Sequence, residues 1–97
     1  MEEIEIQKDS QSLEKENENK YELVVLNDDI NTFDHVILNL IEICGVDDTH
    51  AIQCTLQIHH TGEAIVVDGE KDELELMAEG LDMGGIDAIV RKRENEE

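Results

Sequence analysis

The 97-residue sequence contains no proline and no tryptophan, and it has only one tyrosine and one phenylalanine. With 39% hydrophobic residues and almost no aromatic rings, we expect one modest core made of aliphatic side chains. Without proline, the turns must be formed by glycine, asparagine and aspartate. These features indicate a single small domain.

Basic residues are also scarce, and the formal net charge is −19. Between Tyr21 and Val90 the only basic residue is Lys71, against sixteen acidic ones. Such a surface repels nucleic acid and anionic membranes, and it favours cationic ligands or basic partner surfaces. Solubility, or adaptation to a salty cytoplasm, is an alternative explanation of the same charge.

No apolar run approaches the roughly 20 residues that a membrane span needs. The chain is acidic from its second residue, unlike a secretory signal. Cys44 and Cys54 fall among apolar residues of candidate helices, which indicates reduced and buried thiols. We therefore expect a soluble, cytoplasmic monomer that binds neither nucleic acid nor membrane.

Residues 1–19 carry seven acids and two lysines with few apolar side chains, so we expect a disordered acidic N-terminal extension. The core domain should occupy residues 20–93, and the charged residues 94–97 should fray. Within the core, hydrophobic periodicity predicts the order β-α-α-β-α-β. This is an α+β fold in which a three-stranded sheet packs against three helices.

The predicted element boundaries depend on turn and capping residues. Strands are expected at 21–26, 64–67 and 86–90. The first helix should be capped by Asn31 or Thr32, the second by Asp47 and the third by Asp72, and they should end at Gly45, near His60 and at Gly84-Gly85.

Three polar residues stand where a strand and a helix are expected to end. Asn27 and Asp28 follow the first strand, and His59 lies in the last turn of the second helix. A protein N-terminus, with a pKa of about 7.7–8.0, carries three N–H donors, for which these side chains offer a carbonyl, a carboxylate and a ring nitrogen. His59 must be neutral to accept, so binding should weaken in acid. Alternatively, Asn27-Asp28-Asp29 is only a turn before a helix, and His59 is a surface residue at a helix end.

Two segments about thirty residues apart carry a family resemblance. Together they resemble the ClpS family, the adaptors that carry substrates with particular N-terminal residues (N-degrons) to a Clp unfoldase. The resemblance covers about Tyr21 to Val90. The segments are Leu26-Asn27-Asp28-Asp29 followed by Asn31-Thr32-Phe33-Asp34-His35-Val36, and Leu56-Gln57-Ile58-His59-His60-Thr61-Gly62.

The resemblance implies an adaptor that is not an enzyme and uses no cofactor. Asn27, Asp28 and His59 would hold the substrate α-amine, and the side chain of an N-terminal Leu, Phe, Tyr or Trp would enter an apolar pocket. The resemblance also implies docking on the N-terminal domain of a ClpA- or ClpC-like AAA+ unfoldase, with the N-terminal extension taking part in delivery. The pocket positions matched to the family are Asn31, Thr32, Phe33, Val36, Thr55, Ile58 and Ile89.

Many relatives carry Thr-Pro-Met where this chain has Asn31-Thr32-Phe33, and methionine where it has Thr55. Phe33 is larger and stiffer than methionine, so it would narrow or gate the mouth of the pocket. In relatives the methionine aligned with Thr55 is thought to exclude β-branched side chains, so Thr55 would admit Ile and Val as well. The alternative is that a neighbouring side chain fills the space.

Other classes of function have weaker sequence support. Four histidines and two cysteines supply metal-binding atoms, but no CxxC, HExxH or paired Cys/His spacing is present, so no metal site is expected. No serine or cysteine lies in a nucleophile elbow. The remaining alternative is an acidic protein–protein interaction domain, similar in architecture to the C-terminal domain of the bacterial ribosomal stalk protein.

Overall fold

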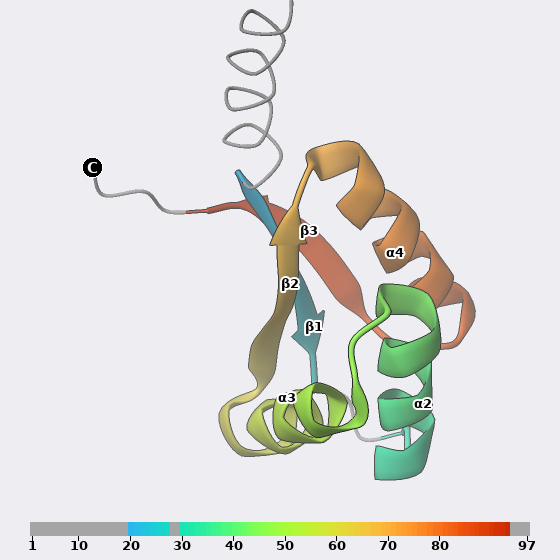
Figure 1. The fold of residues 1–97 in the computed structure, drawn as a ribbon. Helices are drawn as coiled ribbons and strands as arrows, with labels where there is room; N and C mark the ends of the chain where they lie inside the picture. The colour runs from blue at the N-terminus through green and yellow to red at the C-terminus, as the bar shows by residue number, and fades with distance from the viewer. Residues whose placement is uncertain (1–19, 28–29, 94–97) are drawn as a thin grey trace, which may run out of the picture.

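The computed structural model describes residues 20–27 and 30–93 (Figure 1). The predicted β-α-α-β-α-β order is confirmed. The extension expected at 1–19, the end expected to fray at 94–97, and Asp28 lie outside the described residues. The elements are β1 (Tyr21–Leu26), α2 (Phe33–Cys44), α3 (Asp48–Thr61), β2 (Glu63–Gly69), α4 (Lys71–Met83) and β3 (Ala88–Lys92).

The three strands form one antiparallel sheet in the order β2-β1-β3, so β1 is central. In Figure 1, α2 and α4 lie beside the sheet and α3 lies near the end where β1 finishes. Leu23 and Val25 of β1 are at most 1% exposed and join the helices in the core. The other face of the strand carries Val24, which pairs with Ile65 and Ile89, both nearly half exposed. The sheet therefore buries one face against the helices, as the sequence predicts.

The core of the described chain is aliphatic, as expected from the shortage of aromatic residues. Phe33 is 43% exposed, and Tyr21 only packs against the edge of the core. Cys44 and Cys54 are both buried and both free. The buried core residues are Leu23, Val25, Leu40, Cys44, Ala51, Cys54, Ile58, Ala64, Val66, Leu74, Leu81 and Ile86.

A β-bulge interrupts the pairing of β1 with β2. Leu23 pairs with Val67 but Val24 pairs with Ile65, so Val66 is the additional residue. A bulged residue has no partner in the ladder. The ring nitrogen Nε2 of His50, on α3, lies 2.7 Å from the Val66 carbonyl oxygen. This contact satisfies the carbonyl and attaches α3 to the edge of the sheet.

The capping residues of the first two helices are largely those predicted. Thr32, one of two candidates, caps α2 by accepting a hydrogen bond from the His35 amide at 3.1 Å. Asp47 caps α3 in the same way, and Gly45 and Gly62 end these helices with φ of 73° and 97°. These positive φ values favour glycine because a Cβ is strained there.

Several predicted boundaries are wrong. The strand predicted at 64–67 extends over Glu63–Gly69, and the strand predicted to end at residue 90 continues to Lys92. Glu70, not Asp72, precedes α4, and Asp72 lies in the first turn, where a carboxylate also favours the positive helix end. The last strand begins at Ala88 rather than Ile86. The Ile86 amide donates to the Leu81 carbonyl at 2.9 Å, so Ile86 still belongs to the turn that follows α4. Among the residues that the structure describes, none forms a helix long and apolar enough for a membrane span.

Candidate functional site

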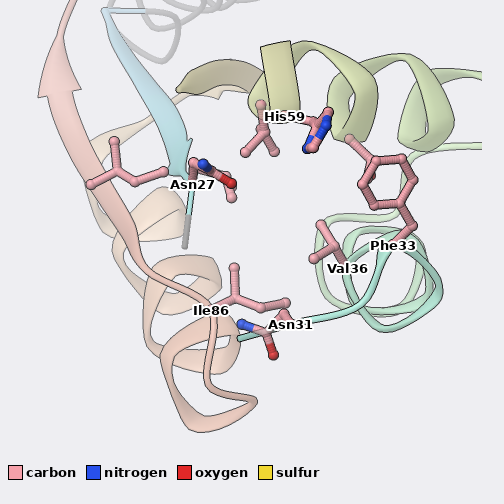
Figure 2. A pocket seen from close by; sticks show the side chains of 10 residues that line it. Asn27, Asn31, Phe33, Val36, His59 and Ile86 are labelled. Carbon is pink, nitrogen blue, oxygen red and sulfur yellow. The ribbon is translucent and has the colours of Figure 1, made fainter. Parts of the chain in front are cut away.

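A cavity of about 60 Å³ lies where the end of β1 meets the start of α2 and the end of α3. Figure 2 shows the labelled side chains arranged round one space, with His59 from α3 and with Phe33 and Val36 from α2. The lining is apolar except for the two asparagines, Thr55 and the histidine. It consists of Val25, Leu26, Asn27, Asn31, Phe33, Val36, Thr55, Ile58, His59 and Ile86.

The polar part of the lining is held by the junction of β1 and α3. The backbone amide of Asn27 donates to the carbonyl of Gly62 at 2.9 Å. Gly62 is the residue that ends α3, and its own amide donates to the Ile58 carbonyl at 2.8 Å. His59 therefore lies in the final turn of a helix whose end is attached to the residue just after β1. This connection brings Asn27 and His59, 32 positions apart in the sequence, to the same cavity.

Half of the apolar lining residues come from α2 and α3, and the others come from β1 and from the turn after α4. Ile58 is 5% exposed, and Thr55, one turn earlier on α3, is 3% exposed. The Thr55 hydroxyl donates to the Ala51 carbonyl at 2.8 Å, so its donor is already used within the helix. Thr55 therefore contributes to this wall as a small side chain whose polar atom is satisfied.

Most of the predicted site residues meet at this cavity. Seven of them line it, whereas Thr32 is occupied as the cap of α2 and is not in the lining. The seven are Asn27, Asn31, Phe33, Val36, Thr55, Ile58 and His59. Asp28 lies outside the described residues, so its placement stays a prediction.

Ile89 is a second predicted pocket residue that is absent from the lining. It pairs with Val24 on the sheet and is 43% exposed. Ile86 lines the cavity instead and is 1% exposed. The physical reason is the late start of β3, since the turn after α4 continues through Ile86. The feature of the sequence that could have indicated Ile86 is the Gly84-Gly85 pair. A turn that starts at these glycines places the next apolar residue against the core.

Two histidines that were considered as metal ligands are engaged with backbone carbonyls. Nε2 of His35 lies 2.7 Å from the Gly84 oxygen, and Nε2 of His50 lies at the same distance from the Val66 oxygen. A carbonyl oxygen only accepts, so in each histidine Nε2 carries the hydrogen. Within residues 20–27 and 30–93, no three His, Cys, Asp or Glu side chains are placed to hold a metal ion together.

Comparison with known proteins defines the class of this domain. Residues 16–83 match the family described as "ATP-dependent Clp protease adaptor protein ClpS". The ClpS adapter of Thermosynechococcus vestitus is 40% identical over 67 residues, which are 68% of this chain and 71% of that protein. The Nostoc sp. ClpS adapter is also 40% identical, over 68% of this chain and 69% of its own length. The chain belongs to the ClpS family of Clp protease adaptors.

A solved structure supports the same fold. Agrobacterium tumefaciens ClpS2, bound to L-phenylalaninamide, superposes with a TM-score of 0.71 at 24% identity, covering 77% of this chain and 99% of that protein. The family match ends at residue 83, before the turn that carries Ile86 and before β3. Ile86, which forms one wall of the cavity, therefore lies beyond the residues that match the family model.

Proposed function

We propose that this protein binds substrates by their free N-terminal residue and delivers them to a Clp-type AAA+ unfoldase. The observation that carries this proposal is the cavity lined mainly by apolar side chains, with Asn27 and His59 at its polar side. Membership of the ClpS adaptor family gives the proposal its context. The family membership also makes the ribosomal-stalk-like alternative the weaker one.

In this proposal the substrate α-amine is held by three acceptors. Asn27 contributes its side-chain carbonyl, His59 a ring nitrogen and Asp28 the carboxylate. Hydrogen bonds between an ammonium and a carboxylate are charge-assisted and contribute about 1.5–3 kcal/mol each. We assign Asp28 to the amine because it follows Asn27 directly in the sequence, and the Asn27 amide is bonded to the Gly62 carbonyl.

The side chain of the first residue enters the apolar part of the cavity. Burying one such side chain contributes about 2–3 kcal/mol. Together with the amine contacts, and after the entropic costs of association, this supports affinities in the micromolar to sub-micromolar range. The ligand of the Agrobacterium protein, phenylalaninamide, has a free amine and a bulky side chain, which is the chemistry proposed here. N-terminal Leu, Phe, Tyr and Trp are the proposed substrates.

The proposed partner is the N-terminal domain of a ClpA- or ClpC-like unfoldase. The test of delivery uses a purified unfoldase with its peptidase and a fluorescent reporter that begins with Leu. Addition of the full chain should accelerate degradation of the Leu-first reporter but not of the same reporter beginning with Ala. Equal rates for the two reporters would count against delivery through the N-terminal residue.

Binding is tested by fluorescence polarisation with labelled peptides that differ only in their first residue (Leu, Phe, Tyr, Trp, Ile, Val or Ala). Each peptide is prepared with a free and an acetylated N-terminus. Free bulky residues should bind, and acetylation should abolish binding because it removes the charge and two of the donors.

Asp28→Ala tests the carboxylate, and it should abolish binding without unfolding the domain. The matched control is Asp34→Ala, which removes the same charge from the exposed first turn of α2, outside the cavity lining. Undiminished affinity of Asp28→Ala would remove Asp28 from the site, and equal loss in both variants would indicate a general effect of charge.

A further inference from the structure

The turn between α4 and β3 is attached by two polar side chains, one from α2 and one from the segment just before this helix. The amide nitrogen Nδ2 of Asn31 donates to the Gly85 carbonyl at 2.8 Å. The ring nitrogen Nε2 of His35 lies 2.7 Å from the Gly84 carbonyl and donates to it. These contacts join residues 54 and 49 positions apart, so they are tertiary contacts and not part of the local turn.

A second side chain of α2, that of Asn39, closely approaches the same turn. A Cβ at Gly84 would meet Oδ1 of Asn39 at 2.7 Å, closer than a side chain can approach without displacing its neighbour. Asn39 is itself oriented, because its Nδ2 donates to the His35 carbonyl at 2.9 Å. Gly85 has φ of 84°, a conformation that favours glycine. We call Asn31, His35 and Asn39 the polar clamp.

The clamped turn places Ile86 in the wall of the cavity. Ile86 directly follows Gly85, is 1% exposed, and borders the same space as Val36 and His59 in Figure 2. β3 starts only at Ala88, so no sheet pairing positions Ile86. Its amide donates to the Leu81 carbonyl and the Asp87 carbonyl accepts from the Leu26 amide, both at 2.9 Å. The two glycines before it are held by the polar clamp, which adds the connection to α2.

We propose that His35 and Asn39 are positioning residues that determine which first side chains the cavity accepts, by setting the depth of the Ile86 wall. This inference rests on the proposed function of the cavity. Neither residue lines the cavity, so neither contacts the bound side chain. Their effect on binding is transmitted through Gly84 and Gly85 to Ile86.

The size of the cavity gives the direction of the effect. A space of about 60 Å³ accommodates roughly four to six water-sized groups. The four carbons of a Leu side chain match this space, whereas an indole ring requires the wall to move. The polar clamp therefore favours Leu over Trp. When the clamp is released and the wall recedes, Leu loses close contacts and Trp gains room.

The test compares the affinities of Leu-first, Phe-first and Trp-first peptides, with free N-termini, for the full chain and for His35→Ala. The ratio of the Trp Kd to the Leu Kd should fall at least threefold in His35→Ala. His35→Gln should restore the original ratio, because a glutamine amide can donate to the Gly84 carbonyl. A merely structural role would change stability but not this ratio.

The matched control is His50→Ala, which removes an equivalent bond from a helix histidine to a backbone carbonyl, at 2.7 Å and away from the cavity. It should lower the melting temperature and leave the Kd ratio unchanged. If circular dichroism shows that His35→Ala is unfolded, Asn39→Ala provides the same comparison with a smaller change. The inference would be overturned if a clamp variant that folds and binds peptide kept the original ratio of the Trp Kd to the Leu Kd. It would also be overturned if His50→Ala changed this ratio equally. Either result would leave the proposed function standing. Failure of the unaltered chain to bind any free peptide would overturn both this inference and the proposed function.

Discussion

The phenyl ring of Phe33 contacts the imidazole of His59 edge to face, with ring centroids 5.2 Å apart and planes inclined at 72°. Phe33 comes from the first turn of α2 and His59 from the last turn of α3, so the contact joins the two helices at the mouth of the cavity. Edge-to-face aromatic pairs contribute about 0.5–1.5 kcal/mol. The pair restrains the ring that is proposed to accept from the substrate amine.

Phe33→Ala should therefore weaken peptide binding by about 2–10-fold, the equivalent of that contact energy. Its effect on the melting temperature should be small, because Phe33 is 43% exposed. Fluorescence polarisation and thermal denaturation measure the two effects. The control is Ile52→Ala, an equally exposed apolar residue on α3 that does not line the cavity. Equal affinities of the two variants would contradict a role for the Phe33–His59 contact.

Acidification should weaken binding through His59. A protonated imidazole has no acceptor nitrogen and places a positive charge beside the substrate ammonium, whereas the neutral ring accepts. We expect the Kd for a Leu-first peptide to rise roughly tenfold in acid, the equivalent of losing one favourable polar contact. His59→Gln should bind more weakly but with little dependence on pH, since an amide does not titrate there.

His60→Gln is the control for this titration, because His60 is the adjacent residue on α3 and is absent from the cavity lining. It should retain the full pH dependence. A pH-independent Kd in the unaltered chain, or a flattened profile in His60→Gln, would show that His59 is not the acceptor.

Thr55→Met should narrow the cavity and change its preference. Thr55 is 3% exposed and contributes a small side chain to a space of about 60 Å³, so a longer side chain enters that space. Affinity should fall for all peptides, and it should fall more for Ile-first and Val-first peptides than for Leu-first ones. Thr55→Val is the control, because valine has a similar shape, and this variant should bind peptides normally. It loses the hydrogen bond to the Ala51 carbonyl, so the free energy of unfolding should fall by up to about 1 kcal/mol. If the unaltered chain and Thr55→Met excluded Ile-first and Val-first peptides equally, the prediction that Thr55 admits these side chains would be wrong.

Cys44 should be inert toward alkylation while the domain is folded. Burial, reinforced by the nearby Cys54, raises the pKa of the Cys44 thiol from 9.0 to about 11. At a given pH below 9 this lowers the thiolate fraction roughly 100-fold, and the thiolate is the reactive form. Iodoacetamide labelling followed by mass spectrometry should therefore detect Cys44 only after denaturation. The control is Cys54→Ala, which removes the smaller contribution and should leave Cys44 protected. Rapid labelling of the folded chain would contradict the burial of this thiol.

The same pKa shift predicts how stability depends on alkaline pH. Because the folded pKa of Cys44 is raised above the unfolded value of 9.0, the unfolded chain releases this proton first as pH increases. The contribution to stability is fully present below about pH 9 and is lost progressively between about pH 9 and pH 11. Urea denaturation at pH 8 and pH 10.5 should show a larger decrease for the unaltered chain than for Cys44→Ala. An equal decrease would assign the alkaline loss to other groups.

The sequence by itself determined the local features of this protein. The period of apolar residues identifies α2, α3 and β1, and the capping residues Thr32 and Asp47 act through neighbours three positions away. Gly62 ends α3 because its backbone conformation suits glycine. Such features depend on residues within one or two helical turns, so one sequence is sufficient to recognise them.

The tertiary structure alone decided which residues complete the cavity. The apolar run predicted a strand from Ile86, and the resemblance to the ClpS family implied that Ile89 is a pocket residue. In the structure the turn held by Asn31 and His35 precedes a β3 that starts only at Ala88, and Ile86 lines the cavity. Likewise, the ring of His50 contacts the Val66 carbonyl, and Val66 is the additional residue of a β-bulge that only the tertiary structure shows. These contacts join residues 16 to 54 positions apart, and their geometry depends on how the elements pack, which local sequence patterns do not encode.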